Sequence, residues 1–177
     1  MKLTTNFTLA ELNFRDLPLY DNLISLAKQL AENLQAIRDF VAVPVKVTSW
    51  YRPTSVNRQA KGSKTSQHLH GEAVDFTVKG LDAVGLDDLF HTIIGLKIKL
   101  PNACTQIIRE TDKDGNNWIH MGIKTPRWIE AQKAVLDSDA NSIAKSKATK
   151  RLTHCECMIT RDTINFELIK YIPFGDF

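Results

Sequence analysis

Two short segments constrain the fold of this 177-residue chain most strongly. Each of them places one potential metal ligand among bulky apolar residues. In Ala73–Val78, valine and phenylalanine occupy every second position, and isoleucine and methionine do so in Trp118–Ile123. Successive side chains of a strand point to opposite faces. The bulky apolar residues therefore take the core face, and Asp75 and His120 share the other, accessible face. The alternation predicts one sheet with both polar residues on the same side.

A second histidine lies close to this pair in the sequence. His68 precedes Asp75 within the segment Ser66–Phe76, and Gly71 between them supplies a bend that folds His68 back towards Asp75. Two imidazoles and one carboxylate around an open fourth position are typical of a catalytic zinc site, whereas structural sites use four protein ligands. A histidine in a strand is more often an ordinary structural residue, so the alternation alone does not establish a metal.

Helical periodicity predicts the elements that surround these strands. The fold class is expected to be α+β, with a small antiparallel sheet that carries the zinc site on one face and helices packed on the other. Helices are expected over Asp21–Val41 (with Asp21 as N-cap), Leu81–Leu96 (opening near Asp82) and Thr125–Leu136, a short helix near Val56–Ala60, and strands over Val43–Ser49 and Cys104–Glu110, the latter in a hairpin with Trp118–Ile123.

Composition excludes several classes of protein. A net charge of +3 is too small to indicate nucleic-acid binding. The polar N-terminus lacks the apolar core of a secretory signal, and no run of about 18 apolar residues predicts a membrane span. Three cysteines cannot all pair within one chain, which favours free thiols in a reducing compartment. We therefore expect synthesis in a cytoplasm.

Three motifs, in order along the chain, resemble one known family. Ser66–Asp75 fits the pattern S-x-H-x-x-G-x-A-x-D, Ser49–Pro53 is similar to S-G-Y-R-S/P, and Trp118-Ile119-His120 looks like W-x-H. These patterns resemble the zinc D-Ala-D-Ala carboxypeptidases and L-Ala-D-Glu endopeptidases. That family includes vancomycin-resistance dipeptidases and phage endolysins that act on peptidoglycan. The resemblance spans roughly residues 7–124 and leaves out the C-terminal third.

The resemblance implies roles for individual residues. His68, Asp75 and His120 would hold Zn²⁺. Arg52, which follows a strand, would bind a substrate carboxylate through its guanidinium and stabilise developing negative charge. Within the first motif, Ser66 and Gln67 would contact the substrate.

The general base is less well defined by the sequence. Many relatives carry an acidic residue three positions before the last histidine ligand, but this chain has Asn117 there, which cannot transfer a proton. Glu110 ends the neighbouring strand, and the hairpin would bring it close to the metal. We favour Glu110 over Glu72 as the base, although a structural strand-end charge is the alternative.

The C-terminal part differs in composition. Residues 141–153 contain four basic residues and no acidic one, which is typical of a solvated linker, and a hairpin of Cys155–Ile159 with Thr163–Ile169 is expected to follow. The sequence thus predicts a zinc peptidase-like domain over residues 1–137. Residues 138–177 would form a basic linker and a short β appendage. The run His154–Cys157 looks like a metal motif but lacks a partner pair elsewhere.

The predicted function is zinc-dependent hydrolysis of peptide bonds next to D-amino acids in peptidoglycan stem peptides. The protein would be a phage enzyme, either released to the cell wall or packaged in a virion, where the C-terminal appendage would dock to virion proteins. We expect neither a nucleic-acid partner nor a membrane span. A catalytically silent, zinc-stabilised module of a phage particle is the alternative that Asn117 favours, and a cytoplasmic dipeptidase is a third. The motifs leave carboxypeptidase and endopeptidase activity equally open.

Overall fold

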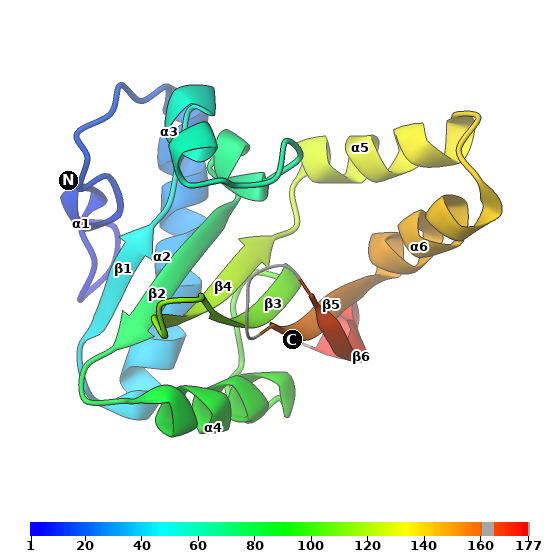
Figure 1. Cartoon of the computed structure of the whole chain (residues 1–177). Helices are drawn as coiled ribbons and strands as arrows, with labels where there is room; N and C mark the ends of the chain where they lie inside the picture. Colours follow the sequence, from blue (N-terminus) through cyan, green and yellow to red (C-terminus); the bar gives the residue numbers. More distant parts are fainter. Residues whose placement is uncertain (161–164, 177) are drawn as a thin grey trace.

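The computed structural model describes residues 1–160 and 165–176, whose centre is a six-stranded sheet in the order β1-β2-β4-β3-β5-β6 (Figure 1). The strands are β1 (Val45–Ser49), β2 (Ala73–Val78), β3 (Cys104–Thr111), β4 (Asn117–Ile123), β5 (His154–Thr160) and β6 (Glu167–Pro173). The helices are α1 (Leu9–Leu12), α2 (Asp21–Val41), α3 (Thr54–Gln59), η1 (Gln67–His70), α4 (Ala83–Ile94), α5 (Pro126–Asp137), α6 (Ser142–Thr153) and η2 (Phe174–Asp176). The expected α+β class is confirmed.

The sheet differs from the expectation in one pairing. Neighbouring strands are antiparallel except β3 and β5, which run parallel. A parallel pair needs a crossover connection, and the chain between β4 and β5 supplies one through α5 and α6. Figure 1 shows these two helices as a hairpin beside the end of the sheet that carries β5 and β6. Within the described part of the chain, no helix is both long and apolar enough to cross a membrane.

Helices α2 and α4 cover the apolar face of the sheet. Phe76 of β2 and Ile119 of β4 are fully buried there, in one cluster with Leu30 of α2 and Phe90 of α4. The span predicted for α2 is confirmed, but its N-cap is Tyr20 instead of Asp21. Asp21 lies in the first turn of the helix, where its carboxylate favourably faces the helix dipole.

Strand register places the polar residues on the opposite face. Asp75 of β2 pairs directly with His120 of β4, and His120 pairs with Ile108 of β3. Glu110 follows Ile108 by two positions and pairs with Trp118, so it lies on the same face. The shared face of Asp75 and His120 is therefore as predicted. The expected accessibility is wrong, since both residues are only 7% exposed.

The C-terminal third belongs to the same sheet. Residues expected to form a solvated linker are helix α6, which Asn141 caps by accepting a hydrogen bond from Ala144 N at 2.9 Å. Strand β5 pairs with β3, and Cys155 and Cys157 are buried in the main core. A hairpin is present as β5 and β6, but its second strand, Glu167–Pro173, ends four residues later than the predicted Thr163–Ile169, whose residues 163 and 164 lie outside the described part. Because β5 pairs with β3 within one sheet, the separate domain expected over residues 1–137 is left to a truncation experiment.

Candidate metal centre

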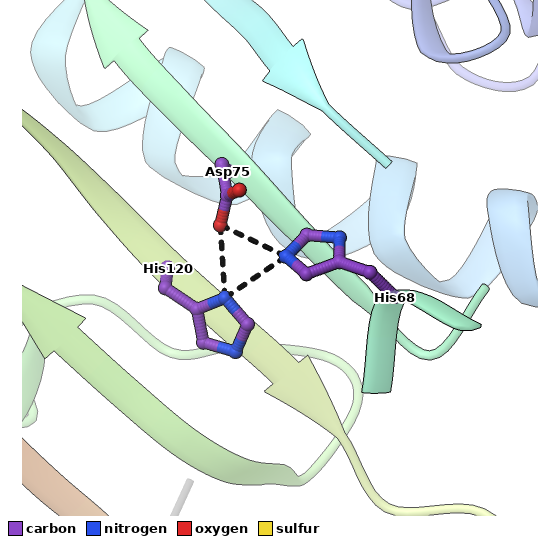
Figure 2. A group of neighbouring side chains, drawn as sticks. All are labelled: His68, Asp75 and His120. Atoms are coloured by element: carbon purple, nitrogen blue, oxygen red, sulfur yellow. Dashed lines mark hydrogen bonds and ion pairs between the residues drawn. The ribbon is translucent and has the colours of Figure 1, made fainter. Parts of the chain in front are cut away.

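Three side chains from three elements converge on one point (Figure 2). His68 Nε2 lies 3.1 Å from Asp75 Oδ1 and 3.2 Å from His120 Nδ1, and His120 Nδ1 lies 2.8 Å from Asp75 Oδ1. Tetrahedral Zn²⁺ with bonds of about 2.0–2.1 Å separates its ligand atoms by roughly 3.3 Å. The three atoms therefore fit around a single metal ion.

The backbone around η1 sets the orientation of His68. Its Nδ1 lies 2.6 Å from the carbonyl oxygen of Trp50, and because a carbonyl only accepts, the proton of the neutral ring is on Nδ1. Nε2 then has a free lone pair directed at the site. Gly71 closes η1 at φ +68°, as the predicted bend requires, and its carbonyl accepts from Trp50 Nε1 at 2.9 Å. Sequence patterns could not indicate the role of Trp50, since its backbone oxygen orients His68.

The electrostatic environment shifts the pKa values of all three candidate ligands. Burial alone would raise the pKa of Asp75, but His68 and His120 outweigh it and hold that pKa well below its usual value. Burial lowers the pKa of His68. Burial opposes protonation of His120 too, yet the hydrogen bond to Asp75 prevails and raises its pKa. An ionised carboxylate and a neutral imidazole are the forms that bind metals, and binding must compete with protonation of His120.

Arg52 lies at the edge of this centre. Its backbone N donates to the carbonyl oxygen of His68 at 2.9 Å, which fixes its position in the chain. Burial lowers the pKa of its half-buried guanidinium, and the charges of Asp75 and Glu110 oppose this effect, so both carboxylates are near. Its Nε is buried and has no hydrogen-bond partner among the described residues. The hydrogen-bonding capacity of Nε is therefore not used by any described residue, and a substrate contact of Arg52 stays a prediction.

Glu110 has the environment of a proton carrier. Burial raises its pKa to about 7, and the negative charge of Asp75 adds to the effect, while His120, Arg52 and a hydrogen bond from Trp118 oppose it. A carboxyl group whose pKa lies near neutrality can both accept and donate a proton. Its position beside the candidate ligands supports the choice of Glu110 over Glu72.

Asn117 faces away from the metal centre. Its Oδ1 accepts from Arg109 Nη2 at 2.7 Å and from Thr111 Oγ1 at 2.8 Å. Arg109 in turn pairs with Asp87 of α4 at 2.8 Å and donates to the carbonyl oxygen of Glu110 at 2.5 Å. Asn117 therefore belongs to a clamp between the hairpin and α4, on the side of the sheet opposite His120.

Other residues singled out from the sequence have structural partners. The buried carboxylate of Glu72 accepts from Arg127 Nε at 2.8 Å and from Thr125 Oγ1, so it anchors the start of α5. Gln67 is buried and donates to Thr105 Oγ1 at 2.9 Å. Ser66 is half-buried at the start of η1. Substrate contacts of Ser66 and Gln67 stay predictions.

Comparison with known proteins places these features in a family. A model of the family Peptidase M15 matches residues 5–102, more than half of the chain. No curated protein matches this sequence. The matched range contains Arg52, His68 and Asp75, whereas Glu110 and His120 lie beyond it. Peptidases of this family are generally zinc-dependent and act on substrates of the peptidoglycan type, which agrees with the buried His–Asp–His group. The chain belongs to the peptidase M15 family, and membership of this family implies a metallopeptidase.

Proposed function

We propose that this protein hydrolyses peptide bonds next to D-amino acids in peptidoglycan stem peptides, with Zn²⁺ held by His68, Asp75 and His120. The convergence of His68 Nε2, Asp75 Oδ1 and His120 Nδ1 within 3.2 Å of one another carries this proposal. Bound Zn²⁺ would polarise the scissile carbonyl and favour ionisation of water at neutral pH.

Glu110 and Arg52 supply the remaining functions in this proposal. Glu110 takes a proton from the attacking water and returns it to the leaving amine, for which a pKa of about 7 is well suited. Arg52 binds a substrate carboxylate with its guanidinium, whose Nε has no partner among the described residues. The mutual electrostatic influence of Arg52, Glu110, Asp75 and His120 supports this assignment of both residues to one site.

The silent-module alternative loses the observation that favoured it. Asn117 was its support, because an acidic residue at that position would have been the base. The side chain of Asn117 contacts Arg109 and Thr111 on the opposite side of the sheet, so in this proposal it takes no part in proton transfer at the metal. Hydrolysis is therefore the function that the geometry supports best.

The biological setting is a further part of the proposal. We infer a phage lytic enzyme or a virion-associated one, and the resemblance of the three motifs to those of phage endolysins supports it. In a virion, the exposed edge strand β6 would be the element that docks to neighbouring proteins.

Digestion of purified peptidoglycan tests the activity. Zinc-loaded protein should release products whose masses distinguish loss of a terminal D-alanine from cleavage inside the stem peptide. Glu110→Gln keeps the size of the side chain but cannot shuttle a proton, so turnover should fall by roughly 10²–10⁴ with zinc content unchanged. Wild-type protein with a full complement of zinc and no products would show that the hydrolysis proposal is wrong.

A further inference from the structure

A second site lies away from the metal centre, between α6 and β6. An open groove of about 650 Å³ is lined there by Ser142, Ile143, Ser146, Lys147, Lys150 and Tyr171. This volume is within the range of roughly 300–1,000 Å³ that is usual for sites of small ligands. None of these residues contributes to the proposed catalytic chemistry.

One face of α6 supplies most of the lining. Ser142, Ser146 and Lys150 follow one another at intervals of four residues, so they form one row along the helix. Tyr171 faces this row from β6, and Lys150 Nζ lies 5.3 Å from the centre of its ring. Ile143 is 78% exposed at the same groove. The groove thus combines hydroxyl groups, ammonium groups, an aromatic ring and an exposed apolar side chain.

The groove carries surplus positive charge. Glu156, which is 1% exposed, pairs with Arg151 at 2.8 Å and with Lys147 at 3.7 Å. Lys150 forms no ion pair with any carboxylate in the described part of the chain, and its ammonium lies 3.3 Å from His154 Nε2. Glu156 is thus shared by Arg151 and Lys147, and Lys150 adds a positive charge without a carboxylate partner in the described part, which leaves the groove attractive to an anion.

We propose that this groove binds an anionic sugar polymer, in which phosphate or carboxylate groups contact Lys147 and Lys150 and a sugar ring lies on Tyr171. Lysine ammonium groups bind such anions as point charges. The tyrosine ring gives a flat apolar surface with a polar tip, and Ser142 and Ser146 provide hydroxyl groups for those of the sugar. Such a site would hold the protein on an anionic polysaccharide surface independently of hydrolysis at the metal centre.

Calorimetric titration with defined polymers tests the ligand class. A glycosylated poly(glycerol phosphate) presents phosphate, an oligogalacturonate presents carboxylate, and dextran is neutral. Binding of either anionic polymer, weakened by added salt, with no binding of dextran, is the expected result, and the preferred polymer identifies the anionic group. Equal binding of dextran, or equally tight binding of duplex DNA at the same phosphate concentration, would overturn the proposal.

Paired charge variants locate the site. Lys147→Ala/Lys150→Ala should weaken binding of the preferred polymer by roughly tenfold, because both removed charges face the groove. Lys97→Ala/Lys99→Ala removes the same charge from exposed positions next to α4 and should bind like the wild type. Equal losses in the two double variants would indicate nonspecific attraction and refute the site. Melting temperatures of the wild type and the two double variants show whether each protein is folded. All three proteins should cleave a peptide substrate without sugar at the same rate.

Discussion

At the residue scale, Asp75 and Glu110 are two carboxylates on the same face of the sheet whose pKa values are shifted in opposite directions. The imidazoles of His68 and His120 hold the pKa of Asp75 well below its usual value, despite burial. Burial raises the pKa of Glu110 to about 7. Environments that push two pKa values apart divide acid–base work between the groups. Asp75 stays ionised as a candidate ligand, and Glu110 can exchange protons.

The pKa of Glu110 predicts a pH-dependent difference in stability. A folded-state pKa of about 7, raised from 4.5, means that its stabilising contribution is complete below pH 4.5 and is lost as pH rises through 7. Glu110→Gln cannot ionise. In metal-free protein this variant should therefore gain on the order of 2 kcal/mol relative to wild type between about pH 5 and pH 8. Urea unfolding at both pH values measures the gain, and a constant difference contradicts the proposed environment.

The position of Asn117 leads to a prediction of unchanged activity. Asn117→Asp places a carboxylate against Arg109, which can form a charge-assisted hydrogen bond there. The substitution should alter stability by less than about 1 kcal/mol and leave turnover on stem peptides at the wild-type level. A large rise in turnover would show that residue 117 reaches the metal centre after all. Zinc content, measured in parallel, separates chemistry from metal loading.

The same alternation that predicts the shared face of Asp75 and His120 also explains why the side chain of Asn117 lies on the opposite face. Residues 117 and 120 are separated by an odd number of positions, so in a regular strand their side chains point to opposite faces. The family pattern suggested a base at residue 117, whereas the local periodicity excluded one. The burial of the site and the tautomer of His68 were not predictable, because both depend on groups such as the Trp50 carbonyl that only the tertiary fold brings near.

At the element scale, the turn from η1 into β2 determines where His68 points. Gly71 has φ +68°, and a Cβ atom at this position would lie 2.6 Å from Leu23 Cδ2 of α2. The turn thus needs both a left-handed conformation and a close approach between the backbone and α2. A larger residue must displace either the Leu23 side chain or η1, and we expect a shift of η1 to move His68 Nε2 away from the other two candidate ligands.

Substitution of this glycine tests the turn. Gly71→Ala should destabilise the protein by at least about 1–2 kcal/mol, the usual cost of a left-handed alanine, and should also weaken zinc binding. Gly80→Ala is the matched control, since Gly80 has φ +83° and a Cβ atom there would meet no other atom within 4 Å. It should show the backbone cost with normal zinc affinity. Equal zinc affinities in the two variants would mean that the turn does not position His68.

Helix α6 forms where the composition of the segment predicts a linker. Its four basic residues and lack of acidic ones favour a solvated linker, yet alanine, lysine and arginine are also good helix formers. The segment forms a helix, which is capped by Asn141 and packs through the buried side chain of Ala148. Lys147 and Lys150 are exposed, whereas Arg151 is half-buried and pairs with the buried carboxylate of Glu156. Tertiary contacts decided between two conformations that the local sequence allowed.

At the scale of the whole molecule, the candidate site depends on parts of the chain that lie far apart in sequence. The family match ends at residue 102, and the strand that carries His120 comes after it. Strand β3 then joins this strand to β5, and Cys157 pairs with Ile107 in the core. The helices and strands were largely predictable from local periodicity, but the parallel pairing of β3 with β5 was not, because it depends on distant contacts.

Truncation tests whether residues 1–137 form a separate domain. A chain that ends at residue 137 loses β5 and β6, which leaves one edge of β3 unpaired and exposes Ile107. It should lack a cooperative thermal transition and bind zinc poorly, as measured by calorimetry and metal analysis. Cooperative melting with zinc bound would instead support an independent domain followed by an appendage.

The central claim is that His68, Asp75 and His120 together hold one Zn²⁺, and metal analysis after dialysis against zinc-free buffer tests it most directly. The wild type should retain about one zinc per chain, as expected for a site with three protein ligands. His120→Ala should retain far less and should melt at a lower temperature in the presence of zinc, because bound metal stabilises the folded state. A full equivalent of zinc in folded His120→Ala protein would contradict the account.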